Sequence, residues 1–331
     1  MDSDKLLIFD TTLRDGGHCR ETALTTQDKF EIALQLERLK VDVIEAGFPG
    51  ASESEFLSVQ RLSRNVRGPI LAALSRDTEK NIESSARALE GARAARIHIY
   101  MAAGRARGKD SIGLEEVLQK TRKAVLLGKK YFSDIEFSPL DASRTEETVL
   151  ARILETAIEA GAGTVNISDT VGYCVPEQFG GLIGYLQSQV KNIGKAIISV
   201  HCHNDLGLGV ANSLAAVKAG ARQVECTVNG IGERAGNAAL EEIVMALRAR
   251  KDYFGVTTAV ETREIQRSSE LVSRITGYAV QQNKAVVGGN AFRGRLKIPE
   301  NSFPKGNENL KLMQPEEVGC KGFEQDLEIQ K

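Results

Sequence analysis

Residues Glu146–Ala160, with the sequence EETVLARILETAIEA, and the following residues Thr164–Thr170, TVNISDT, decide the fold of this 331-residue chain. In the first segment the apolar residues recur three or four positions apart, at Leu150, Ile153, Leu154 and Ala157. That spacing predicts an amphipathic helix with one buried stripe. The second segment is short and rich in β-branched residues, and Gly-Ala-Gly separates it from the first, which predicts a buried strand. The stretch therefore predicts a helix that leads directly into a strand.

The same alternation of strand and helix runs through most of the chain. The strand candidates are Leu6–Leu13, Val41–Gly47, Pro69–Leu74, Arg96–Met101, Asp134–Leu140, Thr164–Thr170, Ala196–Asn204 and Gln223–Gly230. Helical patterns lie between them, as in Thr25–Lys40, and a ninth element, Ala235–Ala249, follows the eighth strand. Eight strand-then-helix units in about 250 residues, without hairpin signals, predict an α/β fold of the (β/α)8 or TIM-barrel type. A doubly wound open sheet is the alternative. It is disfavoured because eight units close a barrel and no glycine-rich dinucleotide turn follows the first strand.

The chain after the eighth unit has a different character. Thr262–Gly277 has a helical pattern, and the residues beyond it are rich in glycine and proline and poor in apolar side chains between Arg293 and Asn309. Such a segment is too short and too polar to form a core of its own. We therefore expect a barrel domain over residues 1–255 and a short helical and irregular C-terminal extension over residues 256–331.

Charge and cysteine content limit the partners and the compartment. The chain has 43 Lys and Arg against 44 Asp and Glu, a formal net charge of -1, so no global field attracts nucleic acid or an anionic membrane. Its five cysteines form no C-x-x-C pair, which favours a reduced, cytoplasmic protein. The N-terminus has no signal-peptide pattern, and charges break every apolar run before about 18 residues, the length that crosses a bilayer. We expect a cytoplasmic protein with no nucleic-acid or membrane partner.

The strongest chemical signal is a pair of histidines at the end of the seventh strand, in Ser199–Asp205, SVHCHND. Side chains two apart in a strand face the same way, so His201 and His203 project together into the barrel mouth while Cys202 points outward to the helices. The chain has only four histidines, which makes the packing of two hydrogen-bonded core histidines here the weaker alternative. Two adjacent imidazoles suit one divalent metal ion.

Further candidate ligands lie at the ends of the neighbouring first and eighth strands. Arg14 and Asp15 place a cation beside a carboxylate, although an exposed ion pair capped by glycine would have the same sequence. Asn237 ends the loop Asn229–Asn237, NGIGERAGN, and is either an oxygen ligand or the N-cap of a helix that begins near Ala238. Carboxylate, imidazole and amide groups form a mixed oxygen and nitrogen set that fits Mn, Mg, Zn or Co, and such an ion polarises a carbonyl.

Other strand ends offer weaker candidates. His98 lies on the fourth strand, Glu136 and Ser138 lie on the fifth, and Thr170 ends the sixth. Glu136 and Ser138 share one face of their strand, and Thr170 can place its hydroxyl toward the same centre. His98 is equally consistent with a core histidine, and Glu45 after the second strand is consistent with a partner for a barrel cation.

The quoted strand ends, together with Phe9–Gly16, FDTTLRDG, resemble the signatures of the DRE-TIM metallolyase family, in the version found in 2-isopropylmalate synthases and close relatives. The similarity runs through most of residues 5–290. It implies a Claisen-type condensation of acetyl-CoA with a 2-oxo acid, followed by thioester hydrolysis. For isopropylmalate synthase the oxo acid is 2-oxoisovalerate, and the formation of 2-isopropylmalate is the first committed step of leucine biosynthesis.

The resemblance also implies roles for the candidate residues. The metal ligands correspond here to Asp15, His201, His203 and Asn237. Arg14 matches the residue that stabilises the oxygen on which negative charge develops. The substrate-binding set that we expect is His98, Glu136, Ser138 and Thr170. Thr170 is expected to hold the carboxylate of the oxo acid. The implied cofactor is a divalent metal, with acetyl-CoA as co-substrate, and the catalytic modules of the family usually form homodimers.

Two departures from the family pattern bear on turnover. Leu140 stands where the family has a glutamate, and the histidine of a G-x-H-Q-D segment is missing where this chain reads Arg293–Pro299, RGRLKIP. In the family these two groups are thought to act together in taking a proton from the acetyl group. Leucine can supply neither the pKa nor the reach of a base. We therefore expect an enzyme of acyltransferase type whose turnover is impaired.

Alternatives from other classes follow from the same residues. Homocitrate and citramalate synthases differ in the pocket for the oxo acid side chain, which one sequence does not define. A catalytically inactive protein that binds metal and 2-oxo acid would keep the ligands and lose the base. A lyase or aldolase is disfavoured by Asn229–Asn237. The chain also stops where isopropylmalate synthases continue into a regulatory domain, so we expect no leucine inhibition at such a domain.

Overall fold

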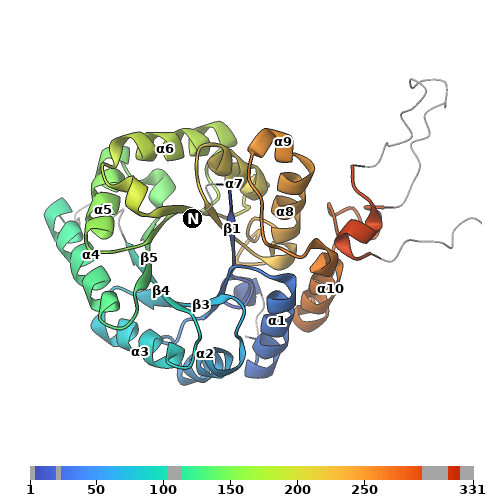
Figure 1. The fold of residues 1–331 in the computed structure, drawn as a ribbon, viewed down its shortest axis with the longest axis horizontal. Helices are drawn as coiled ribbons and strands as arrows, with labels where there is room; N and C mark the ends of the chain where they lie inside the picture. Colours follow the sequence, from blue (N-terminus) through green and yellow to red (C-terminus); the bar gives the residue numbers. More distant parts are fainter. Residues whose placement is uncertain (1–3, 20–23, 103–112, 293–311, 321–331) are drawn as a thin grey trace, which may run out of the picture.

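The computed structural model describes residues 4–19, 24–102, 113–292 and 312–320, and it confirms the closed (β/α)8 barrel (Figure 1). Eight strands pair in chain order, and the eighth pairs with the first. The strands are β1 (Leu7–Asp10), β2 (Val43–Gly47), β3 (Ile70–Arg76), β4 (Ala95–Ala102), β5 (Asp134–Leu140), β6 (Thr164–Asp169), β7 (Ile197–Cys202) and β8 (Gln223–Cys226). Every pairing is parallel, so the C-terminal ends of the strands meet at one mouth, where active sites of this fold lie.

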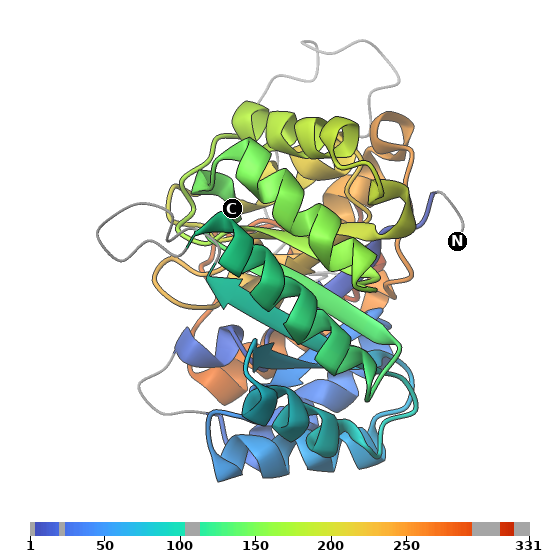
Figure 2. The same cartoon turned by 90° about the vertical axis from the view of Figure 1, so that its left-hand side faces the viewer.

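A ring of helices surrounds the barrel (Figure 1, Figure 2). The helices of this ring are α1 (Thr26–Leu39), α2 (Glu53–Asn65), α3 (Glu79–Leu89), α4 (Leu114–Lys129), α5 (Glu147–Glu159), α6 (Pro176–Gln189), α7 (Gly209–Lys218) and α8 (Leu240–Ala249). The main apolar core lies between these helices and the outward faces of the strands and includes Phe137 and Leu154. Inside the barrel, a small apolar cluster of Phe9, Val43 and Ala72 lies among many buried polar side chains.

The helix predicted over Thr25–Lys40 shows how the sequence sets a boundary. The Thr25 hydroxyl accepts a hydrogen bond from the Asp28 backbone N–H at 3.1 Å, and the Asp28 carboxylate accepts one from the Thr25 N–H at 2.9 Å. This reciprocal pair is a capping box, and it fixes the start of α1. Lys40 adopts the left-handed conformation at φ 59° and ends the helix. The predicted range Thr25–Lys40 therefore consists of α1 and its two capping residues. The predicted range Glu146–Ala160 corresponds to α5 and its two capping residues in the same way.

The predicted first and eighth strands extend too far. β1 ends at Asp10 because the Asp10 carboxylate accepts hydrogen bonds from both the backbone N–H and the hydroxyl of Thr12, each at 2.9 Å, which turns the chain. β8 ends at Cys226, and Asn229 soon afterwards takes the left-handed conformation at φ 63°. In both places the residues beyond the strand form a loop over the barrel mouth.

The helix predicted over Ala235–Ala249 begins later than expected. α8 starts at Leu240, and its N-cap is Ala239, so the alternative role of Asn237 as a helix cap is wrong. The Asn237 backbone N–H instead donates to the Gly230 carbonyl at 2.9 Å, and the residue forms an isolated antiparallel bridge with His203. These contacts hold Asn237 in the loop at the mouth, beside the end of β7.

The chain beyond α8 returns to the first helix. After α9 (Lys251–Phe254), the predicted helical stretch is a 3-10 turn, η5 (Thr262–Glu264), continued by α10 (Ile265–Thr276), which Gly277 ends at φ 75°. The Gln35 side chain on α1 donates to Glu264 at 2.8 Å and to Ser268 at 3.1 Å. The side-by-side placement of α10 and α1 is visible in Figure 1.

After α10 the described part of the extension consists of the irregular residues 278–292 and of residues 312–320, which include one 3-10 turn, η7 (Pro315–Val318). Residues 293–311 and 321–331 lie outside the described residues, and so does Arg293–Pro299, the segment where the resemblance implies a histidine. The division into domains at residue 255 stays a prediction. Within the described ranges, none of the helices combines the length and the apolar character needed to span a bilayer.

We expect Phe137→Ala to lower the free energy of unfolding by about 3–5 kcal/mol, because Phe137 is fully buried between β5 and the helices and its removal leaves a cavity. Urea denaturation followed by circular dichroism measures this change. The control is Leu126→Ala on α4, where the side chain is 50% exposed and a change within about 0.5 kcal/mol is expected. Equal losses in the two variants would contradict the position of the core.

Candidate functional site

The candidate metal ligands meet at the C-terminal mouth of the barrel, on or just after the adjacent strands β7, β8 and β1. Asp15 follows β1, His201 lies on β7, and His203 lies just beyond it. All three side chains are buried, and one potential ligand atom from each lies within 4.8 Å of the others. Asn237 joins them from the loop after β8, whose strand pairs with both β7 and β1. The sequence placed these residues together, and the geometry of the fold confirms that they meet.

The candidate ligand atoms of this group lie between 2.7 and 3.8 Å from one another in the pairs that contact. The Nε2 atoms of His201 and His203 lie 3.7 Å and 3.8 Å from the same atom, Asp15 Oδ2. Asn237 Oδ1 lies 2.7 Å from His201 Nε2, and Asn237 Nδ2 donates to Asp15 Oδ1 at 3.1 Å. The two imidazole rings are stacked, with centroids 4.9 Å apart and an interplanar angle of 11°. This confirms that both rings face the mouth, and Cys202 between them is buried in the outer core, as predicted.

The loop after β8 approaches this group closely at Gly232. A Cβ atom at this position would collide with Asn237 Nδ2 and would lie 3.0 Å from Asp15 Oδ1. Glycine is therefore required there for the loop to reach the carboxylate and the amide. His203 Nδ1 is a buried atom that has no hydrogen-bond partner among the described residues.

Charges around the group set its protonation. Burial disfavours a charged Asp15, but the Arg14 guanidinium and the two imidazoles hold the pKa of this carboxyl well below its usual range. Burial disfavours a protonated His201 as well, but the Glu225 carboxylate, 2.6 Å from Nδ1, raises the pKa of His201 to about 9. Burial and the neighbouring His201 charge lower the pKa of His203 to about 4. Asp15 and His203 are thus in the protonation states that a metal ion requires, and His201 must release one proton.

Arg14 is not the exposed residue that the alternative assumed. Its Nη1 donates to Asp15 Oδ2 at 2.8 Å and its Nε donates to Glu45 Oε2 at 2.7 Å, with only 13% of the side chain exposed. Glu45, which is fully buried, also accepts hydrogen bonds from Thr11 at 2.6 Å and lies 2.8 Å from His98 Nδ1. The prediction that Glu45 pairs with a barrel cation is confirmed, and this pairing fixes the position of Arg14 beside Asp15.

The expected substrate-binding residues occupy two levels of the barrel. His98 Nε2 lies 2.6 Å from Ser138 Oγ, so these two side chains form one buried group near the mouth. Thr170 lies just past β6, half-buried, and its hydroxyl accepts from the Asp141 N–H at 3.0 Å. Glu136 lies deeper, with its Oε2 2.9 Å from Arg96 Nη1 and its Oε1 2.8 Å from the Gln223 amide. The substrate-binding roles of these residues stay predictions.

Sequence reasoning missed Glu225, the residue on β8 that contacts His201. A carboxylate against the second nitrogen of a metal-binding imidazole fixes the tautomer and the orientation of the ring. The signal was present, because β8 reads Gln-Val-Glu-Cys and alternation places Gln223 and Glu225 on the inward face. Arg96 was also missed. It is the second residue of β4 and lies near the strand starts, in register with Asp134 at the start of β5.

Leu140 lies at the end of β5, half-buried, and pairs in register with Ala102. The described residues therefore have an aliphatic side chain at the position where the resemblance implies a glutamate.

Comparison with known proteins defines the class of this barrel. The sequence pattern of the HMGL-like family matches residues 5–272, and the chain belongs to that family. A 2-isopropylmalate synthase from Methylacidiphilum infernorum is 51% identical over 331 residues, covering 99% of this chain and 65% of that protein. A 2-isopropylmalate synthase from Methylococcus capsulatus is 53% identical over 318 residues, covering 96% of this chain and 62% of that protein. The chain thus spans under two thirds of the length of these relatives.

Solved structures agree with the fold. A hydroxymethylglutaryl-CoA lyase from Pseudomonas aeruginosa has a TM-score of 0.69 and 18% sequence identity, covering 84% of this chain and 95% of that one.

We expect Glu225→Gln to lower the pKa of His201 in the metal-free protein from about 9 toward or below its ordinary value of 6.5, because the substitution removes the carboxylate that stabilises the imidazolium. Histidine side-chain NMR measures this titration, and the chain has only four histidines to assign. Glu53→Gln, an exposed residue on α2, is the control and is expected to leave the titration unchanged. An unchanged His201 pKa in Glu225→Gln would show that Glu225 does not set it.

Proposed function

We propose that this chain is the catalytic barrel of a 2-isopropylmalate synthase, which condenses acetyl-CoA with 2-oxoisovalerate to form 2-isopropylmalate. The observation that carries the proposal is the convergence of Asp15, His201 and His203 at the barrel mouth, in a chain about half identical to proteins with that name. Active sites of this fold lie at that mouth. The product commits carbon to leucine biosynthesis.

The donor set fits one divalent metal ion, for which Mn, Mg, Zn and Co are all suitable. We assign Asp15, His201, His203 and the Asn237 carbonyl oxygen as its ligands. Charge supports this assignment. Asp15, Glu45 and Glu225 carry three buried negative charges at the mouth, Arg14 carries one positive charge, and with neutral imidazoles a divalent ion balances the remaining two. When bound, the ion supplies Lewis-acid polarisation of the 2-oxo group.

The residues of this chain then divide the remaining tasks. Arg14, held between Asp15 and Glu45, presents a fixed cation to the oxygen that gains negative charge during addition to the carbonyl. Glu225 holds the His201 ring through Nδ1 and leaves Nε2 facing the other ligands. The Thr170 hydroxyl binds the carboxylate of the oxo acid, and His98 and Ser138 line the pocket with Glu136 beneath them.

Proton transfer is where we propose that turnover is impaired. Removal of a proton from the acetyl methyl group requires a base of suitable pKa within reach of the carbon. Leu140 supplies none at the position where the family has a glutamate. This observation favours a second candidate function, a catalytically inactive paralogue that binds metal and 2-oxo acid. Homocitrate synthase and citramalate synthase activities stay as alternatives, since these enzymes differ in the oxo acid that their pocket accepts.

We also infer a homodimer and a cytoplasmic location. The dimer follows from the resemblance to the family's catalytic modules. The location is supported by four cysteines, Cys174, Cys202, Cys226 and Cys320, that are free thiols in the described residues.

We expect Mn2+ to stabilise the protein against heat and Asp15→Asn to abolish that stabilisation, because the variant loses the anionic ligand. At a metal concentration about 100 times Kd, the expected gain is about 2.7 kcal/mol. Differential scanning calorimetry with and without Mn2+ measures the effect. The control is Asp252→Asn, at an exposed carboxylate on α9, which should keep the full stabilisation. The ligand assignment is wrong if Asp15→Asn and Asp252→Asn respond equally.

We expect purified protein to release free CoA when it receives Mn2+ or Mg2+, acetyl-CoA and 2-oxoisovalerate. A thiol reagent measures the release, Asp15→Ala should abolish it, and Arg14→Gln should lower kcat by about 100-fold or more because a preorganised cation is lost. Release that requires Asp15 would establish the synthase and show that another group replaces the missing base. Metal binding without any CoA release would instead establish the inactive paralogue.

A further inference from the structure

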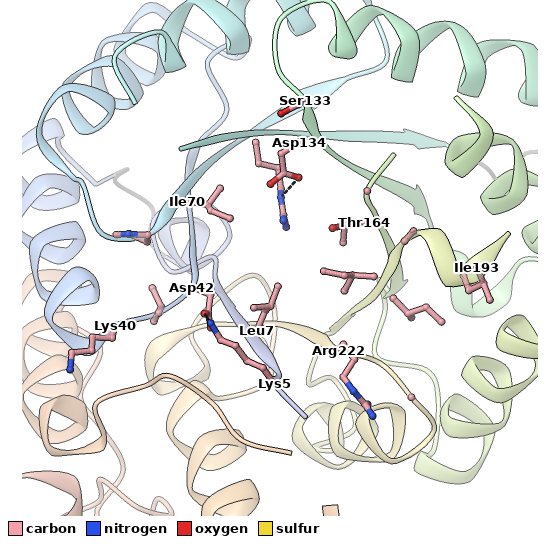
Figure 3. A pocket seen from close by; sticks show the side chains of 18 of the residues that line it. Lys5, Leu7, Lys40, Asp42, Ile70, Ser133, Asp134, Thr164, Ile193 and Arg222 are labelled. Atoms are coloured by element: carbon pink, nitrogen blue, oxygen red, sulfur yellow. Dashed lines mark hydrogen bonds and ion pairs between the residues drawn. The ribbon is translucent and has the colours of Figure 1, made fainter. Parts of the chain in front are cut away.

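The opposite end of the barrel contains a second cavity that the proposed reaction does not use. It has a volume of about 1230 Å³ and is lined by residues at or just before the starts of all eight strands, among them Leu7, Ile70, Thr164 and Arg222 (Figure 3). Asp15, His201 and His203 lie at the other ends of these strands. The cavity is therefore separate from the metal site and exceeds the volume of an ordinary small-molecule pocket, about 300–1,000 Å³.

The lining of this cavity exposes more apolar than polar surface, although seven charged residues contribute to it. Leu7, Ile70 and Ile197 line it while remaining only half-buried, so their apolar surface is still exposed to solvent. Lys5 and Asp42, which form an ion pair of 2.6 Å, lie side by side at its edge in Figure 3. A concave apolar surface with a few convergent polar groups is the usual form of a site for a small organic ligand.

Arg96 provides the polar group at the inner end. Its side chain is only 4% exposed, and it lines the cavity. Its Nε donates to Asp134 at 2.9 Å, and its Nη1 donates to Glu136 at 2.9 Å and to Gln223 at 2.7 Å. Its Nη2 makes no hydrogen bond within the described part of the chain, although every other polar atom of the guanidinium is engaged. A buried, fixed guanidinium whose Nη2 group is unused can donate a charge-assisted hydrogen bond to an anion.

The lining of the cavity carries charges of both signs. Four lining residues are cationic, namely Lys5, Lys40, Arg96 and Arg222, and three are anionic, namely Glu37, Asp42 and Asp134. Arg96 and Lys40 are each also paired with a carboxylate outside the lining, Glu136 and Glu261, so an anion would be recognised by its contact with Arg96 Nη2 and not by the net charge of the lining.

We propose that this cavity binds a small amphipathic monoanion, with its apolar body against Leu7, Ile70 and Ile197 and its single anionic head on Arg96 Nη2. The head is of the carboxylate class, whose oxygen accepts a charge-assisted hydrogen bond from Nη2. The site is distinct from the metal centre, so it stands whether or not the barrel is an active synthase.

Two glycines allow the cavity to be filled without disturbing the fold. Gly163 and Gly194 both line it, and a Cβ atom at either position meets no atom within 4 Å. Gly184 on α6 offers the same open space but does not line the cavity, which makes it a matched control. The chain contains no tryptophan, so a Gly→Trp substitution also introduces a single fluorescent reporter of correct folding.

The test uses the fluorescent anion 8-anilinonaphthalene-1-sulfonate, and octanoate and octanol as competitors. We expect octanoate to displace the dye at least about tenfold more strongly than octanol, since only octanoate carries the head group. Gly163→Trp and Gly194→Trp should each weaken dye and octanoate binding about tenfold or more, and Gly184→Trp should leave both unchanged. Arg96→Gln should remove the preference for octanoate while octanol binds as before.

The proposal is overturned if octanol competes as well as octanoate with the native protein, or if the two cavity-filling variants bind the dye like Gly184→Trp. Should Arg96→Gln fail to fold, the comparison of the two competitors and the glycine variants decide the question without it. Catalytic assays do not enter the test, so failure of the proposed synthase activity would leave its result unaffected.

Discussion

The rest of the structure depends on how charged side chains are kept inside a closed barrel. Glu45 is fully buried and receives Thr11, Arg14 and His98, so one carboxylate joins β2 to β4 and to the end of β1. Burying a charge is costly unless it is paired and hydrogen-bonded, and breaking such a pair typically costs about 3–5 kcal/mol. The interior side chains are therefore fixed as a set. This rigidity holds Asp15 and Arg14 at the mouth in one arrangement.

Two arginines divide the interior into two levels. Arg14 binds Asp15 and Glu45 at the C-terminal mouth, and Arg96 binds Asp134 and Glu136 near the strand starts. Gln223 connects the lower level across the barrel by donating to Glu136 and Ser199. The buried polar side chains thus form a connected network around the small apolar cluster of Phe9, Val43 and Ala72. The two ends of the barrel can carry different chemistry because this network separates them.

The fold and the shared orientation of the two histidines could be predicted from the sequence, for physical reasons. The strand and helix periods are local properties, and His201 and His203 share a face by the alternation of a strand alone. The loop after β8 could not be predicted in the same way, because Asn237 is held by Gly230 and His203, which are contacts between segments. The pairing of Glu225 with His201 also depends on which strands are neighbours.

The position of the proposed metal ligands along the chain has a consequence for biogenesis. Asp15 and Asn237 touch each other, yet 222 positions of sequence separate them, and they come from the two strands that close the ring. A chain emerging from the ribosome therefore cannot assemble the ion-binding group until its eighth strand has been made. Closing so long a loop is entropically unfavourable. The binding free energy of the ion would stabilise the pairing of β8 with β1, which closes the barrel. Metal availability during synthesis would then influence how much of this protein reaches its closed form.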